Sequence, residues 1–321
     1  MSCFHPLNVL NLGYDQNGKK KIHFCMTEAE WQMAPDFQKM KLPCGRCVGC
    51  RLERSRQWAN RCMLELQYHD SAYFVTLTYD DEHIPVTYYA EDEDGVARGG
   101  FSLRFRDLEL FWKRLRKAHP DDKIRYFACG EYGSTTYRPH YHAIIFGLTL
   151  DDLRPYKRSP QNYDYFISDS LAECWGLGYV VVGPVTWETC AYTARYIMKK
   201  ALGEGAEVYE RFNIEPEDTR MSRKPGIGYQ YYADHPELYK YEYINLPTDK
   251  GQLKFKPPRY YDRLFDIDNP DEMKHIKATR RKFAKATEEA KNAQTTLSEP
   301  DRLAVEEAAL MARIKSLERK L

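Results

Sequence analysis

The segment at residues 138–147 constrains this chain more than any other, with the sequence Arg-Pro-His-Tyr-His-Ala-Ile-Ile-Phe-Gly. Two histidines separated by one residue lead into an apolar, β-branched run that is typical of a β-strand. Because successive side chains of a strand point to opposite faces, His140 and His142 share one face of the sheet. A lone histidine in a strand is more often structural, but two imidazoles on one face can bind the same metal ion. The pair therefore predicts a metal site.

A third ligand for this site is expected from the preceding segment. Glu131 lies just after a predicted strand at residues 124–129, where a neighbouring strand would bring it close to the histidines. By itself Glu131 is interpreted equally well as a carboxylate of a surface loop. Two histidines and one carboxylate leave positions for water and phosphate oxygens, which suits a Lewis acid. This ligand set would accept Mn²⁺ or Mg²⁺, with Zn²⁺ as a further possibility.

A pair of tyrosines follows fifty residues later, in the segment Tyr-Thr-Ala-Arg-Tyr-Ile-Met-Lys-Lys at residues 192–200. In a helix, Tyr192 and Tyr196 are neighbours on one face, with Lys199 about one turn further on. The chain has 25 tyrosines, so packing is the more common reason for such a pair. The interleaved bases favour chemistry, because a tyrosine hydroxyl becomes a good nucleophile only where a cation or metal favours the phenolate. Lys199 could stabilise the phenolate or the leaving oxygen.

Cysteines form the third candidate site. The chain has nine cysteines, and its first residues lack the basic region and apolar core of a signal peptide, so thiols or metal ligands are expected rather than disulfides. Cys44, Cys47 and Cys50 are spaced as C-x2-C-x2-C, which suits Zn²⁺ or an iron–sulfur cluster. A structural zinc is the favoured interpretation, and three reduced thiols in a turn are the alternative. The candidates for the fourth ligand are Cys3 as first choice, then His5, Cys25 and Cys62.

Composition restricts the class of protein. At 321 residues, with 30% charged and 43% hydrophobic residues, one or two ordinary domains are expected. No apolar run approaches the roughly 20 residues of a membrane span, so we expect a cytoplasmic protein. The net charge of +1 does not indicate nucleic-acid binding, but the bases are clustered. Residues 41–62 carry six Lys/Arg against one acid, and residues 98–125 carry nine against four. Such runs can attract phosphates or simply be solvated helix faces.

The periodicity of apolar residues predicts an α+β protein, with an antiparallel sheet and helices packed on one face. Residues 1–50 are expected to be irregular, and residues 204–265 show no clear period. Thr186 is a candidate helix N-cap, although Thr189 stands where a capping box has Glu or Gln. The remaining expectations are strands at residues 72–79 and 178–183, helices at residues 51–69, 107–118, 169–174 and 186–202, a short helix from Asp151, and one or two helices beyond Asp271 that break near residues 298–300.

The three motifs together resemble a known superfamily. The strand at residues 74–79, the segment Pro139-His140-Tyr141-His142 and the tyrosine segment at 192–200 occur in the order of the three HUH endonuclease motifs. The two-tyrosine form resembles the rolling-circle replication initiators of small single-stranded DNA phages. The cysteine segment at residues 42–51, with the basic helix after it, is similar to the initiators of gokushovirus-type microviruses.

This resemblance implies a fold. A central five-stranded antiparallel sheet of RRM or ferredoxin type would carry the histidines on a middle strand, between flanking helices, with a Cys-rich N-terminal arm and a helical C-terminal tail. The implied division is a Cys-rich arm with a basic helix at 1–70, a nicking and joining domain at 71–203, a Tyr- and Pro-rich region at 204–265, and a charged helical tail at 266–321.

The resemblance also implies a reaction. One of Tyr192 and Tyr196 attacks a phosphate of single-stranded DNA at the phage origin, which leaves a 5′-phosphotyrosine and a 3′-OH primer, and the other tyrosine acts at the end of the circuit. Lys199 supports them, and Mg²⁺ or Mn²⁺ bound by His140, His142 and Glu131 polarises the phosphate. The sequence at residues 13–19 fits a phosphate-binding loop only until Lys20 replaces the required Ser or Thr. A host helicase and DNA polymerase in the bacterial cytoplasm are therefore expected partners.

Two other functions remain open from the sequence. One is a non-catalytic, RRM-like nucleic-acid-binding protein with a zinc-stabilised arm, in which aromatic residues such as Phe74 and Phe127 stack on bases. The other is a metal-dependent hydrolase of small molecules, which would leave Tyr192 and Tyr196 without a role.

Overall fold

The protein divides into two compact units. The computed structural model describes residues 3–16, 19–90, 96–133, 135–158, 162–195, 203–248 and 251–318. One unit combines Met1–Glu53 with Asp271–Leu321, and the other is Arg54–Pro270. The four-part division expected from the sequence stays a prediction.

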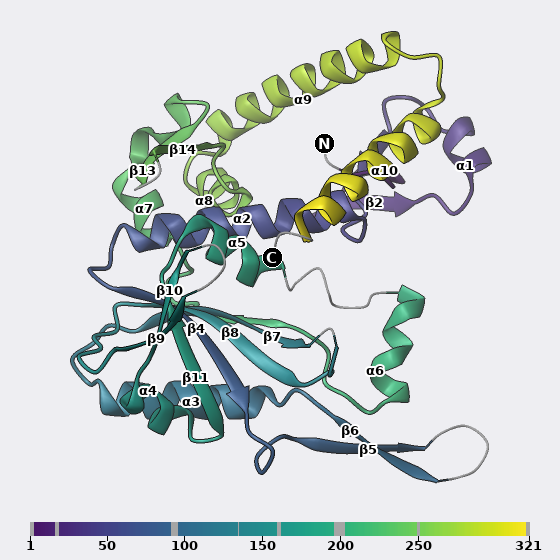
Figure 1. Cartoon of the computed structure of the whole chain (residues 1–321). Coiled ribbons are helices and arrows are strands. Elements are labelled where there is room, and N and C mark those ends of the chain that lie inside the picture. Colours follow the sequence, from purple (N-terminus) through teal and green to yellow (C-terminus); the bar gives the residue numbers. More distant parts are fainter. Residues whose placement is uncertain are drawn as a thin grey trace. The chain divides into compact units, whose positions relative to one another are not determined.

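The larger unit is built on a seven-stranded antiparallel sheet with the order β12-β7-β8-β4-β11-β10-β9 (Figure 1). Four expected strands form its centre: β4 (Ala72–Tyr79), β7 (Arg125–Tyr132), β8 (Pro139–Phe146) and β11 (Gly178–Gly183). The α+β class and the antiparallel sheet are therefore confirmed, but the expected count of five strands is wrong for this sheet. The additional strands lie at its two edges: β9 (Arg154–Arg158), β10 (Asp164–Ile167) and β12 (Thr219–Met221).

The edge strands escaped prediction because they lack an apolar face. All five residues of β9 are exposed, and β12 has only three residues. The short helix expected from Asp151 is also wrong, since the chain soon enters β9. The Asp152 carboxylate instead accepts hydrogen bonds from the Ser170 amide, at 2.8 Å, and the Ser168 hydroxyl, at 2.7 Å. This acidic side chain therefore supports the start of a later helix, α4 (Asp169–Trp175).

Helices cover both faces of the sheet, which corrects the expectation of one covered face. On one face, α3 (Phe105–Ala118) and α4 pack against Val75, Leu77 and Tyr79 of β4. On the other face, α2 (Val48–Leu66), α5 (Trp187–Arg195) and α8 (Arg259–Asp268) contribute to a second cluster around Phe74. Neighbouring residues of one strand thus enter different cores, because their side chains alternate. We call these the α3 face and the α5 face.

Residues 204–265 form short elements that are too brief to show a period in the sequence. Outside the main sheet, β5 (Val86–Ala90) and β6 (Ala97–Phe101) form one hairpin, and β13 (Ile244–Thr248) and β14 (Gly251–Phe255) form another. The remaining helices are α6 (Glu207–Arg211), α7 (Tyr229–Asp234) and the 3₁₀ helices Gly203–Ala206 and Pro236–Lys240. Among the described residues, no helix combines the length and apolar character needed to cross a membrane.

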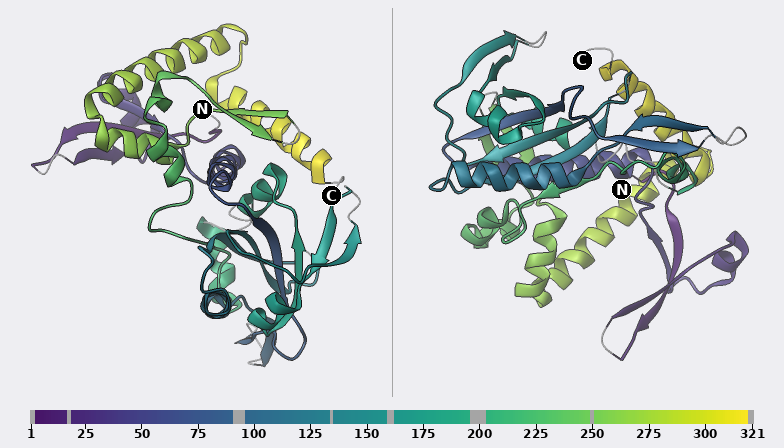
Figure 2. Two further views of the ribbon diagram at one scale, coloured as in Figure 1. Left: turned by 90° about the vertical axis from the view of Figure 1, so that its left-hand side faces the viewer. Right: turned by 90° about the horizontal axis from the view of Figure 1, so that it is seen from below.

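The smaller unit is not irregular at its N-terminus, as had been expected. There β1 (Leu7–Tyr14) pairs with β2 (Lys20–Phe24) and β3 (Lys39–Leu42), and α1 (Glu28–Met33) follows β2 (Figure 2). A break in the register between Asn11 and Tyr14 interrupts the alternation by which a strand is recognised. The expected helical tail is confirmed as α9 (Pro270–Ala293) and α10 (Glu299–Glu318). Arg302, only 6% exposed, joins them through Glu288 and Glu306.

The α3 face gives a test of the packing. Phe111 is fully buried between α3 and the sheet, with its ring centroid 6.0 Å from that of Trp175. Replacing Phe111 by Ala leaves a cavity, so we expect the free energy of unfolding of the larger unit to fall by about 3–5 kcal/mol. Urea denaturation followed by circular dichroism measures this loss. Lys113→Ala, on the exposed side of the same helix, should change it by less than about 0.5 kcal/mol; equal losses for both variants would contradict the assigned core.

Candidate active site

Strand pairing brings Glu131 and the two histidines to one face of the sheet. In the antiparallel pair of β7 and β8, Glu131 lies directly opposite His140. On the other side of β8, Thr76 of β4 lies opposite His142. Because paired residues of adjacent strands share a face, all four side chains belong to the α5 face. Glu131 stands within β7, which extends to Tyr132, and so it is not a residue of a surface loop.

The three expected ligands converge. The Glu131 Oε1 atom lies 2.6 Å from Nε2 of His140 and 3.7 Å from Nε2 of His142. One ligand atom from each residue lies within 4.8 Å of the other two. Glu131 and His142 are 4% and 5% exposed, so the group is largely removed from water. Two imidazole nitrogens and a carboxylate oxygen are a donor set that fits one divalent cation, although these donors alone do not identify the metal.

The second nitrogen of each imidazole is held by the protein. Nδ1 of His140 donates to the carbonyl oxygen of Arg138 at 3.1 Å. Because a carbonyl only accepts, Nε2 of the neutral ring must carry a lone pair, and a proton or a cation must lie between it and Glu131. Nδ1 of His142 lies 3.0 Å from Oγ1 of Thr76. Such hydrogen bonds orient imidazole ligands. Thr76 was not identified from the sequence, because its contact depends on strand register.

Glu131 is held in its charged form. Burial by itself raises the pKa of this carboxyl group, but hydrogen bonds with His140 and His142 outweigh that cost and lower the pKa to about 2. The ionised carboxylate is the form that binds a cation.

Tyr192 reaches the same place from α5. Its ring centroid lies 5.3 Å from that of His142 and 6.1 Å from that of Phe74, with both ring pairs edge-to-face. The ring is half-buried on the α5 face. The structure therefore brings together Tyr192, His140, His142 and Glu131. Tyr196 and Lys199, which were expected beside them, lie outside the described residues.

The start of α5 is fixed by a reciprocal pair of hydrogen bonds. The amide of Thr189 donates to Oγ1 of Thr186 at 3.2 Å, and the amide of Thr186 donates to Oγ1 of Thr189 at 2.8 Å. Thr189 thus completes the capping box that lacked a Glu or Gln in the sequence. This cap fixes the first turn of the helix, from which Tyr192 follows one turn later.

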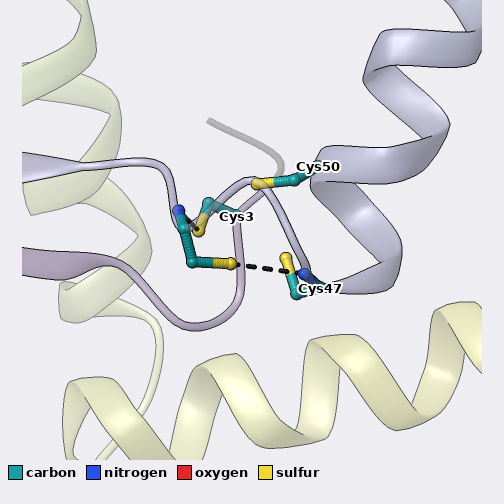
Figure 3. Close-up of side chains that lie close together, drawn as sticks. Cys3, Cys47 and Cys50 are labelled. Atoms are coloured by element: carbon teal, nitrogen blue, oxygen red, sulfur yellow. Dashed lines mark hydrogen bonds between the residues drawn. The ribbon is translucent and has the colours of Figure 1, made fainter. Parts of the chain in front are cut away.

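The four cysteines expected to bind a second metal also meet, within the smaller unit. The sulfur atoms of Cys3, Cys44, Cys47 and Cys50 all lie within 4.8 Å of one another, and Figure 3 shows three of these side chains close together. Cys3, the first choice for the fourth position, is therefore the one that joins the group. The other candidates have different surroundings: His5 pairs with Glu307 at 2.6 Å, and Cys25 and Cys62 are not in the group.

Backbone amides support negative charge on these sulfurs. The amides of Cys44 and Cys47 donate to the sulfurs of Cys3 and Cys44 respectively, both at 3.3 Å, and the Phe4 amide donates to Cys47 at 3.4 Å. For Cys47, burial raises the pKa of the thiol, but amide donors including that of Phe4 bring it down to about 7. Four sulfurs that can become thiolates form a site suited to a thiolate-binding metal.

Comparisons with known proteins agree with this arrangement. A sequence model of the replication-associated protein ORF2 family matches residues 72–201. The chain is 34% identical over 326 residues to replication-associated protein ORF2 of Spiroplasma virus 4, which covers all of this chain and 98% of that relative. It is 27% identical over 280 residues to replication-associated protein VP4 of Bdellovibrio phage phiMH2K, covering 84% of this chain and 79% of the relative. No solved structure matches significantly.

The hydrogen bond from Thr76 generates a prediction. Thr76→Val keeps the shape of the side chain but removes the hydroxyl that orients His142. We expect the affinity for Mn²⁺ to fall about 10- to 100-fold, as measured by isothermal titration calorimetry. Thr78→Val is the matched control, because Thr78 lies opposite His140 on the same strand but has no hydrogen bond to either imidazole among the described residues. Equal affinities in the two variants would remove the orienting role of Thr76.

Proposed function

The chain belongs to the ORF2 family of phage replication-associated proteins, and we propose that it initiates rolling-circle replication of a phage genome by cutting and rejoining single-stranded DNA. The observation that carries this proposal is the position of the Tyr192 ring, 5.3 Å from that of a histidine in a two-histidine, one-carboxylate cluster. A hydroxyl nucleophile beside ligands for a divalent cation suits phosphoryl transfer.

The residues of the cluster have separate roles in this reaction. His140, His142 and Glu131 hold the cation, which when bound supplies positive charge to the non-bridging oxygens of the scissile phosphate. Arg138 and Thr76 keep the two imidazoles oriented. The oxygen of Tyr192 loses its proton and forms a bond to phosphorus, while the bond from phosphorus to the 3′ oxygen breaks. That oxygen takes up a proton and becomes the 3′-OH primer, and the 5′ end stays bound as a phosphotyrosine.

Rejoining needs no other source of energy. The phosphotyrosine keeps the energy of the original phosphodiester, so a 3′-OH can attack it and release the tyrosine. Tyr196 would provide the second nucleophile for the regenerated origin, and Lys199 would stabilise the phenolate. Unwinding and synthesis are assigned to a helicase and a polymerase of the bacterial host, in whose cytoplasm the reaction would take place.

A non-catalytic binding protein has less support. That function needs aromatic side chains displayed on an open face of the sheet. Phe74 is 6% exposed and Phe127 is fully buried, with its ring stacked 4.8 Å from that of Trp58. Because helices cover these two rings, they are not free to stack on bases.

The cysteine group is proposed to hold a structural Zn²⁺. A single tetrahedral zinc, with bonds of about 2.3 Å to each sulfur, requires four sulfurs close together. The limit of 4.8 Å satisfies this requirement. In an iron–sulfur cluster each cysteine binds one of several iron atoms, which holds the sulfurs further apart. The ion would fix the N-terminal residues to the start of α2.

The nicking proposal is tested by trapping the covalent intermediate. Incubation with circular single-stranded phage DNA and Mn²⁺ or Mg²⁺ should give a protein–DNA adduct on a denaturing gel. The double variant Tyr192→Phe and Tyr196→Phe has neither hydroxyl, so we expect the adduct to fall to background. Tyr179→Phe is the matched control, because Tyr179 is 69% exposed on β11, and should leave the adduct unchanged. An adduct that persists in the double variant, or intact DNA with both metals, would count against the proposal.

The zinc proposal is tested by metal analysis of the purified protein. We expect one zinc per chain by plasma mass spectrometry, and its loss in Cys47→Ser/Cys50→Ser together with a lower thermal midpoint, because metal binding contributes to folding. Cys25→Ser, a cysteine of the same unit outside the group, should retain the zinc. Iron in place of zinc would change the identity of the metal, and neither metal would refute the site.

A further inference from the structure

A basic cavity of about 600 Å³ lies on the α3 face of the larger unit, the face opposite to Glu131. Its walls come from α3, from the start of β7 and from β12 with the residues that follow it. We call this cavity the β12 groove. Residues 98–125, whose excess of bases was noted in the sequence, provide one of its walls. The proposed nicking reaction gives this groove no role.

The rim of the groove carries uncompensated positive charge. Five basic side chains line it, against Glu109 as the one acid. Two of the five already have carboxylate partners, because Arg125 pairs with Glu65 and Arg220 pairs with Asp218. The other three are the exposed residues Arg116, Arg223 and Lys224, and among the described residues none of them forms an ion pair with a carboxylate. The rim therefore favours an anion.

The floor of the groove is aromatic. The rings of Trp112 and Tyr126 stack with centroids 4.0 Å apart, and the Arg116 guanidinium lies 5.6 Å from the Tyr126 ring. Arg220 lies 4.4 Å from the ring of Phe105. Trp112 is 3% exposed, and its buried indole N–H has no hydrogen-bond acceptor among the described residues. A buried donor without an acceptor is uncommon, so the groove suits a ligand rich in acceptor oxygens.

We propose that the β12 groove binds a segment of the single-stranded DNA on which the candidate active site acts, a proposal that rests on the proposed function. Basic rims over aromatic and guanidinium planes are the means by which proteins hold single strands without reading their sequence. The volume has room for a nucleotide-sized group, which a simple inorganic anion would not fill. Phosphates contact Arg116, Arg223 and Lys224, and a base lies against the planar side chains.

The position of the groove determines which part of the strand it binds. Tyr126 and Glu131 are five residues apart on β7, which corresponds to roughly 17 Å along the strand. They face opposite sides of the sheet, and only the edge strand β12 lies outside β7 on this side. A DNA strand therefore reaches the groove by crossing this edge. At about 3.4 Å or more per nucleotide, the bound segment begins roughly three to five nucleotides from the scissile phosphate.

The proposal is tested by DNA binding with charge-reversal variants of exposed residues. The full chain with Tyr192→Phe, which cannot use Tyr192 as a nucleophile, is titrated into fluorescein-labelled oligo(dT) and followed by fluorescence anisotropy. Adding Arg223→Glu/Lys224→Glu should lower the affinity for an oligomer of about 20 nucleotides at least tenfold. It should also reduce the slope of log affinity against log salt by about 0.7 for each phosphate that the protein no longer neutralises. Arg116→Glu, on α3, tests the opposite wall and should act in the same direction.

The matched control is Lys282→Glu/Lys285→Glu on α9, which makes the same change in net charge at two exposed positions outside the groove. If this control and the groove variants lose affinity equally, or if none of them does, the groove is not a DNA site. A shorter oligomer of about three nucleotides, too short to span both sites, separates the two proposals. With Tyr192 intact, loss of covalent adduct only on long DNA assigns the groove to strand binding. Absence of adduct with normal, groove-dependent affinity would refute the nicking reaction and leave the groove as a binding site.

Discussion

The register between β7 and β8 is the constraint on which the candidate active site depends. Glu131 faces His140 only because these two residues are paired directly in the antiparallel ladder. A slip of one residue would turn Glu131 to the other face of the sheet, where the core around Leu108 and Phe111 has no place for a charge. The Arg138 carbonyl links register and chemistry, since it accepts the Gly133 amide, which closes the connection between the strands, and also orients His140.

Burial on both faces explains why this register is stable. Side chains of β8 alternate between two apolar cores, with Tyr141 and Ala143 on the α3 face and Ile144 and Phe146 on the α5 face. Each core resists a shift of the strand, because a shift would move apolar residues out of one core and polar residues into it. The histidines continue the α5 face at the end of this strand. The same sheet therefore holds a polar cluster on one face and the β12 groove on the other.

The two groups of metal-binding residues differ in how far the sequence could identify them. The C-x2-C-x2-C spacing brings three sulfurs together locally, and Cys3 joins them through amide–sulfur hydrogen bonds with Cys44 that no local pattern reveals. Likewise, the i,i+2 spacing places both histidines on one face, but Thr76 and Glu131 reach them only through pairing of three strands. Edge strands such as β9 and β12 were missed for a related reason. Their pairing partners, and not an apolar pattern of their own, make them strands.

By itself, the sequence determined which residue types stand together at short range: the histidine pair, the cysteine spacing, the central strands and the helix that carries Tyr192. These follow from local periodicity, which each segment carries independently of the rest of the chain. The tertiary structure alone decided that Glu131 lies inside a strand, that both faces of the sheet are covered, and that bases from α3 meet those after β12 at one groove. Such contacts join residues as many as 108 positions apart, as between Arg116 and Lys224. They depend on the packing energy of the whole unit, because no single segment contains the partner that fixes its position.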